Sequence, residues 1–137
     1  MIDAETPIYD KIITQLLARS DLPNFASSSE YVRAPAEFPF ISIVEMDNRT
    51  DQATKDSGHG EHLAVLTYEI NVYSNRINAK KRECRKLADA VDEIMLGMNF
   101  HRMSLGPVGN PADSGIYRVV GRYEVMIDAE GRLYYRR

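Results

Sequence analysis

The segment LTYEINVYSN, residues 66–75, alternates apolar and polar side chains and then stops at Ser74-Asn75. Such alternation predicts a β-strand with one face in the core. From residue 79 to residue 96 the apolar side chains instead recur at helical spacing. They share one helix face, which consists of Cys84, Leu87, Ala88, Val91, Ile94, Met95 and Met98. A half-apolar strand followed by an amphipathic helix predicts a layered fold, with helices packed on a sheet.

The remaining chain repeats these two patterns. A first helix is predicted to have Thr6 as its N-cap and Pro7 as its first residue, and to close at Leu22-Pro23. Its apolar stripe would consist of Ile8, Ile12, Ile13, Leu16 and Leu17. Strands are predicted at 31–33, 38–46, 63–73, 98–108, 116–127 and 133–135. Gly97 is expected to take the left-handed conformation that ends the second helix. This order predicts an α+β fold with two helices packed on one face of a mainly antiparallel β-sheet.

One long polar segment interrupts these elements. Residues 47–62, DNRTDQATKDSGHGEH, contain no large apolar side chain. We therefore expect a loop there, between antiparallel strands at 38–46 and 63–73. With 137 residues and no internal repeat, the chain is predicted to form a single domain over residues 1–137.

Composition narrows the class of protein. The net charge is −3, which argues against a dedicated nucleic-acid binder. A single cysteine allows no internal disulfide and fits a reducing compartment. The N-terminal segment lacks a signal-peptide pattern, and no apolar run approaches the roughly 20 residues that span a bilayer. We expect a soluble, cytoplasmic protein with no membrane association.

Two histidines offer the first candidate chemistry. His59 and His62 lie in the polar segment beside Asp56 and Glu61, so a metal site is conceivable there. However, HGEH has neither the helical spacing nor the order of a known zinc motif. The sequence favours a solvated loop over a metal centre.

The other reactive side chains are expected to be structural. Cys84 falls on the apolar face of the second predicted helix, where burial raises a thiol pKa and core packing is the usual role. Three carboxylates of the same helix are expected on its solvated outer face: Asp89, Asp92 and Glu93. We therefore predict that the protein is not an enzyme and needs no cofactor or metal.

The charge order of the second helix is more informative. Lys80, Lys81 and Arg82 crowd its first turn, and Arg85 and Lys86 follow in the next. This order opposes the helix dipole, at a cost of about 0.3–1 kcal/mol for each exposed charge. Either packing offsets the cost, or the basic end meets an acidic surface on another subunit.

Charged residues outside the second helix also suggest a contact with another subunit. Arg118 and Arg122 are predicted on the polar face of strand 116–127, as solvated side chains or as interface residues. Asp47, Asp51 and Asp56 in the polar segment would supply the opposite charge. These residues, with the first-turn cations, form the predicted subunit or partner interface.

The pattern resembles the tail terminator (tail completion) proteins of long-tailed, non-contractile phages. The resemblance rests on FPFISIVE, the polar loop, LTYEINVYSN, a helix ending in IMLGMNF, YRVVGRYEVMID and GRLYYRR. These segments cover residues 35–137, and the opening helix also fits. They match a profile of strands and helices rather than a catalytic motif.

The resemblance implies a phage structural protein that caps the tail tube, stops its polymerisation and offers a surface for head–tail joining. It implies a ring, expected to be a homo-hexamer, whose partners are the tail tube protein and a head-completion protein. DNA would pass through the ring without specific binding. The protein would occupy the host cytoplasm during assembly and the virion neck afterwards. Two alternatives stay open: a head-side connector, or a small metal-dependent hydrolase using the His59/His62 loop.

Overall fold

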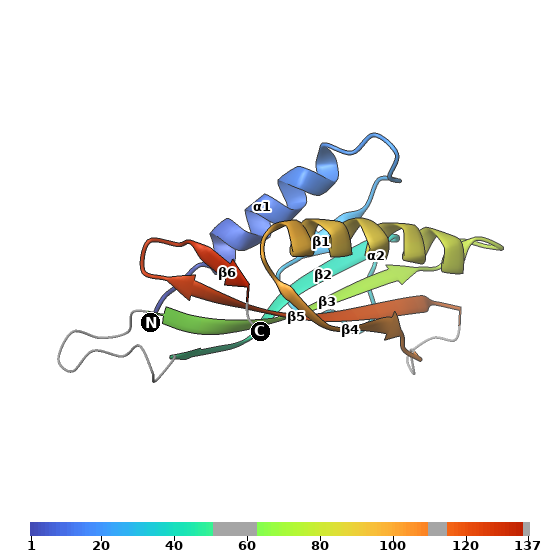
Figure 1. The fold of residues 1–137 in the computed structure, drawn as a ribbon. Coiled ribbons are helices and arrows are strands. Elements are labelled where there is room, and N and C mark those ends of the chain that lie inside the picture. Colours follow the sequence, from blue (N-terminus) through green and yellow to red (C-terminus); the bar gives the residue numbers. More distant parts are fainter. Residues whose placement is uncertain (51–62, 110–114, 136–137) are drawn as a thin grey trace.

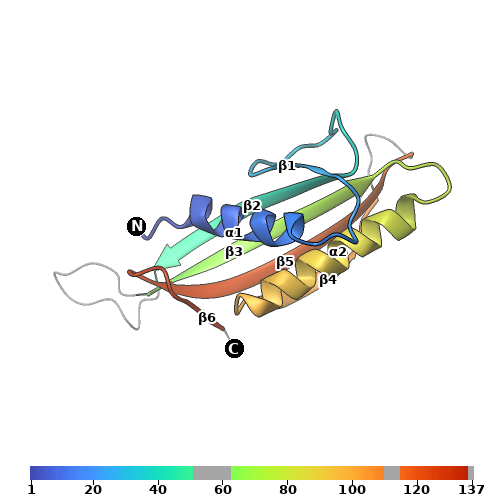
Figure 2. The ribbon, with the colours of Figure 1, turned by 90° about the horizontal axis from the view of Figure 1, so that it is seen from above.

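The computed structural model describes residues 1–50, 63–109 and 115–135. Within these residues two helices, α1 (Glu5–Leu17) and α2 (Lys80–Gly97), lie on one face of a mostly antiparallel sheet (Figure 1; Figure 2). The strands are β1 (Ala26–Ser28), β2 (Phe40–Thr50), β3 (Leu63–Ser74), β4 (His101–Pro107), β5 (Tyr117–Asp128) and β6 (Leu133–Tyr135). Their order is β1-β2-β3-β5-β4, and β6 pairs with β5 beyond the end of β4. The predicted α+β class is confirmed.

Helix α1 differs from its prediction at both ends. Its buried residues are Ile8, Ile12 and Leu16. The Thr6 N-cap is wrong, because Ala4 holds that position and no side chain caps the helix. Pro7 is tolerated inside the first turn, where backbone N–H groups have no helical partner. Leu17 ends the helix and is 70% exposed, since its direction is turned by about 100° from the buried row. The predicted closure at Leu22-Pro23 is therefore also wrong.

The first strands lie elsewhere than the sequence suggested. Residues 31–33 form no strand; β1 occurs earlier and pairs in parallel with the start of β2, through Ala26 opposite Phe40. The segment after β1 instead crosses one end of the sheet, where the Tyr73 hydroxyl donates to the Val32 carbonyl at 2.7 Å. Three residues of parallel pairing carry too little periodicity to be recognised in a sequence.

The predicted loop at 47–62 begins too early. Asp47–Thr50 belong to β2 and pair with Thr67–Ala64 of β3, so the polar character of these residues did not prevent strand formation. Pairing between neighbouring strands outweighs the weak intrinsic preference of such residues. The antiparallel pairing of β2 with β3 is confirmed. Residues 51–62, the remainder of that predicted loop, lie outside the described part of the chain.

Helix α2 follows its prediction closely. All seven residues of its predicted apolar face are buried: Cys84, Leu87, Ala88, Val91, Ile94, Met95 and Met98. Gly97 does not take the left-handed conformation, because it remains the last residue of the helix. Asn99, two residues later, has a φ of 71° instead. Asparagine is one of the few side chains that tolerate this region.

The C-terminal strands were largely predicted. The apolar face of β5 packs into the core through Val119, Tyr123, Val125 and Ile127. A turn then leads to β6, in which the Gly131 N–H donates to the Asp128 carbonyl at 3.0 Å. This is the three-residue spacing of a β-turn.

Large aromatic side chains fill the layer between helices and sheet. Tyr68 meets Phe100 edge to face, with ring centroids 5.6 Å apart. Tyr123 is 1% exposed, and its hydroxyl donates to the Asp92 carboxylate of α2 at 2.9 Å. Asp92 also accepts from Arg102 at 2.7 Å, so the prediction that it is a solvated side chain is wrong. This carboxylate ties α2 to β4 and β5.

Candidate interaction surface

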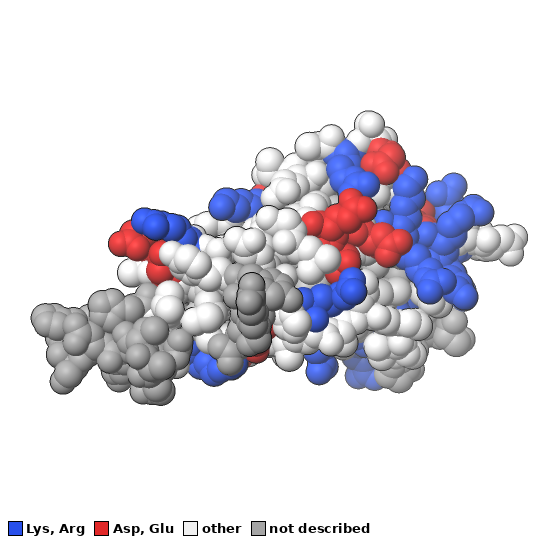
Figure 3. All heavy atoms as spheres, viewed as in Figure 1, with Lys and Arg blue, Asp and Glu red and all other residues white. Residues whose placement is uncertain are grey.

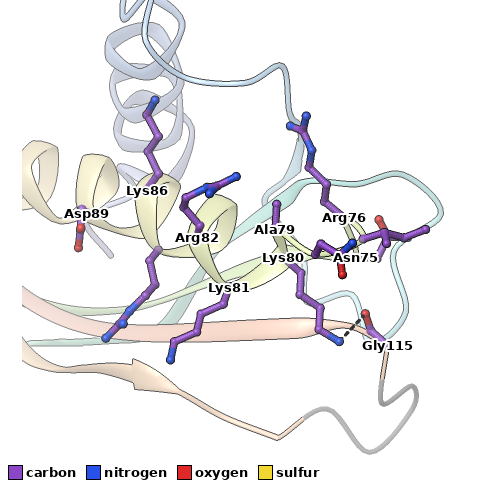
Figure 4. Close-up of a pocket in the computed structure, with 12 residues that line it drawn as sticks. Asn75, Arg76, Ala79, Lys80, Lys81, Arg82, Lys86, Asp89 and Gly115 are labelled. Carbon is purple, nitrogen blue, oxygen red and sulfur yellow. Dashed lines mark hydrogen bonds between the residues drawn. The ribbon is translucent and has the colours of Figure 1, made fainter.

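The most distinctive surface lies where α2 begins. Six cations gather there, and Figure 3 shows them as a basic patch at one end of the molecule. We call this group the basic end; its residues are Arg76, Lys80, Lys81, Arg82, Arg85 and Lys86. They surround an open hollow of about 1080 Å³, which Asn75, Ile77 and Gly115 also line. In Figure 4 the labelled cations of α2 point in several directions and Arg76 lies just before the helix, so the group forms a broad surface rather than one row.

Three of these six cations have no partner within the described residues. Arg76 forms an ion pair with Glu83 at 3.2 Å, and the Lys80 ammonium donates to the Gly115 carbonyl at 3.5 Å. Lys81, Arg82 and Arg85 make neither an ion pair nor a hydrogen bond with any residue that the structure describes. Among the described residues, half of the cations of the basic end therefore lack a compensating charge.

The local structure does not account for this arrangement. Ala79 holds the N-cap position of α2, and no side chain caps the helix. Glu83 is the single acidic residue of the first turn, and the last turn carries no basic residue. The first-turn cations thus oppose the dipole at the N-terminal end of the helix, and the last turn carries no basic residue that would favour it. The first-turn cations are therefore unfavourable for the helix itself, and its local structure offers no reason for their position.

A second charged group, the acidic end, lies near the start of α1. It consists of Asp3, Glu5 and Glu45. Burial raises the pKa of Glu45; a hydrogen bond from Tyr68, 3.1 Å long, opposes the rise, and the charges of Glu5 and Asp3 add to it. Figure 1 places the start of α1 beside the N-terminus, at the opposite end of the molecule from the start of α2. The basic end and the acidic end therefore lie at opposite ends of the described structure.

Arg118 is not the solvated side chain that one of its two predictions expected, and its interface role stays a prediction. Its guanidinium donates two hydrogen bonds to the Asn71 side-chain oxygen, at 2.9 and 2.6 Å, and only 13% of its side chain is exposed. The same group lies 5.8 Å from the centre of the Tyr31 ring and 5.7 Å from that of Tyr73. Arg118 thereby fastens the segment after β1 to the sheet face opposite the helices. Its hydrogen bonds are made within the chain.

The other predicted interface residues are dispersed. Arg122 is 60% exposed and lies 3.3 Å from the Glu69 carboxylate. Asp47 forms an exposed ion pair with Arg49 at 3.3 Å, far along the sheet from the basic end. Asp51 and Asp56 lie outside the described residues, so the structure does not place them.

Of the side chains considered for chemistry, the structure describes Cys84 but not the two histidines of the polar segment. Cys84 is fully buried, donates its thiol proton to the Val72 carbonyl with a 3.0 Å separation, and has a pKa raised by burial to about 12. Its predicted core position is confirmed. His59 and His62 lie outside the described residues. Among the residues described, no three His, Cys, Asp or Glu side chains gather as metal ligands would.

Two features of the surface were missed from the sequence. The acidic end combines residues at the start of α1 with Glu45 of β2, some 40 residues later in the chain, and no local pattern predicts that they lie close together. The network of Glu69, Asn71 and Arg118 was hidden because alternating polar residues suggest a solvated face. One signal was present: strands 63–73 and 116–127 carry opposite charges on their polar faces, as paired strands often do.

Comparisons with known proteins add no family to this description. No protein-family model matches the chain, and a search of curated proteins finds no significant match. Neither of the two described helices has the length and apolar character needed to cross a bilayer.

Proposed function

We propose that this chain is a phage structural protein that caps the end of the tail tube as a ring and offers a surface for head–tail joining. Two lines of argument support it. The order of strands and helices resembles that of tail terminator proteins, as the sequence indicates. The observation that carries the proposal is the separation of charge between the basic end and the acidic end.

This separation favours association of identical subunits. The chain has 20 acidic and 17 basic residues, so outside the six cations of the basic end the acidic residues exceed the basic ones by nine. A basic surface on one copy then complements an acidic surface on the next. Because the two surfaces differ, the contact is heterologous, and heterologous contacts generate rings when the rotation closes. Charge complementarity also selects the correct partner and speeds the encounter.

A capping role requires binding and no reaction. A growing tube presents the same unsatisfied surface after each added ring, and a protein that occupies this surface without regenerating it stops growth. An excess of negative charge suits a channel for DNA, because like charge disfavours phosphate binding. We assign no catalytic residue and no cofactor to this role.

An assembly extract from cells whose phage or prophage lacks this protein tests the proposal. We expect filled heads, unjoined tubes and many tubes of abnormal length in electron micrographs. Added purified protein should cap the tubes and restore joining. The Lys81→Glu variant should need at least about tenfold more protein for the same effect, because like charges at an interface cost several kcal/mol.

The matched control is Lys11→Glu, the same charge change on the exposed side of α1. This variant should restore joining as well as the unaltered protein does. Tails of normal length attached to heads in the absence of the protein would contradict the terminator role. Heads that leak DNA beside free tails of normal length would assign the protein to the head side of the joint.

A further inference from the structure

The two outer strands of the sheet leave backbone groups unpaired. β1 pairs with β2 only through Phe40–Ser42, so from Val44 to Arg49 the outer side of β2 has no strand partner among the described residues. On the opposite edge, the outer side of β4 is unpaired in the described chain from Arg102 to Gly106. Free N–H and C=O groups in a row attract another strand.

Both edges carry the same irregularity. The β2–β3 register shifts between Glu45 and Asp47, and the β4–β5 register shifts between Arg102 and Ser104. The residue left out of register is a methionine in each case: Met46 is 57% exposed and Met103 is 52% exposed. A bulge re-aims a side chain and interrupts the ladder. Each edge therefore presents one large, adaptable apolar side chain to solvent.

Charge distinguishes the two edges and indicates what covers them. The β2 edge carries Glu45 of the acidic end, and Asp47 lies beside the bulge. α1 lies over the β2 side of the sheet, whereas α2, with the basic end, lies over the β4 side (Figure 2). The two edges lie on opposite sides of the sheet, with the carboxylates of Glu45 and Asp47 on either side of Met46 at one edge and Arg102 next to Met103 at the other. Each edge is thus suited to the opposite edge of a second copy of this chain.

We infer that the β2 edge of one copy docks against the β4 edge of the next, with Met46 packed against Met103. This inference rests on the proposed ring and adds the two strand edges to the charged surfaces that join neighbouring copies. The bulges limit strand pairing to short stretches on either side of the methionines, which restrains open-ended edge-to-edge growth. Each docked copy still offers one free edge, so copies can be added until the ring closes.

Cysteine cross-linking tests the contact. Met46→Cys and Met103→Cys are made as separate variants, mixed, and oxidised with copper phenanthroline. We expect a covalent dimer on a non-reducing gel from the mixture and none from either variant alone. The double variant should give a ladder of covalent oligomers. The native Cys84 should not react, because it is buried and its thiol pKa is raised to about 12.

Leu17→Cys, on an exposed position of α1, is the collision control and should not cross-link to Met103→Cys. The mass of the unaltered protein, measured by light scattering, separates the two proposals. An oligomer without the mixed cross-link overturns the edge contact and leaves the ring intact. A cross-link in Met46→Cys alone also overturns it, because like edges would then meet. A monomer without any cross-link overturns both proposals.

Discussion

Replacing Gly121 by alanine is expected to destabilise the fold by about 1–3 kcal/mol, the usual cost of overpacking. A Cβ at this position of β5 would lie 2.8 Å from Cε2 of Tyr123 and 3.2 Å from Cδ1 of Leu105. The tyrosine ring cannot yield easily, because it is buried and its hydroxyl is held by Asp92. Urea unfolding followed by circular dichroism measures the loss.

Gly106→Ala is the matched control. Gly106 lies on the neighbouring strand β4, opposite Val120, and a Cβ there would meet nothing within 4 Å. Alanine at this site should leave stability unchanged or raise it slightly, since glycine costs roughly 0.5–1 kcal/mol within a strand. Equal losses at the two glycines would show that contact with Tyr123 is not the cause.

Arg118→Met is expected to cost about 1–3 kcal/mol of unfolding free energy, because it leaves the buried side-chain oxygen of Asn71 without a donor and removes one of the cations near Glu69. Asn71 is fully buried and Glu69 is 8% exposed, so neither side chain can turn to water. Methionine keeps the apolar stem of arginine and removes the hydrogen bonds and charge. Hydrogen exchange should also show lost protection around Val32, because the cation between Tyr31 and Tyr73 is gone.

Arg122→Met provides the comparison. Arg122 approaches the same Glu69 carboxylate but is 60% exposed, and exposed ion pairs contribute only about 0–1 kcal/mol. We expect a small loss of stability and unchanged exchange at residues 29–33. A larger loss at Arg122 than at Arg118 would contradict the stabilising role of the Arg118–Asn71 hydrogen bonds.

Elements with a strong period could be predicted from the sequence. Helix α2 and strand β5 each bury one face against the same core. Their apolar residues therefore recur with a regular period that the sequence shows. Sequence patterns did not predict the strands whose position depends on their pairing partners. β2 continues through Asp47–Thr50 because β3 supplies its hydrogen bonds, and β1 depends on three parallel pairs. Neither leaves a local signal.

For the candidate surface, too, groups of residues close in sequence could be predicted and groups brought together by the fold could not. Five cations of the basic end were predicted because they are neighbours on one helix and oppose its dipole; Arg76 precedes the helix and was not predicted. Arg118 was misjudged because its partners come from β3 and from the segment near Tyr31, which only the fold brings together. The acidic end was missed for the same reason, since Glu45 is far from Asp3 in the chain.

The central claim, that identical subunits form a closed ring, is tested most directly by the particle that the purified protein forms. Light scattering should give one mass that is a multiple of the 15.6 kDa subunit, with six copies as the expected number. Negative-stain electron micrographs should show rings of uniform diameter. Raising the salt concentration should dissociate them, because charge between exposed surfaces is screened. A 15.6 kDa monomer at every protein and salt concentration, or a symmetric dimer that grows no further, would contradict the account.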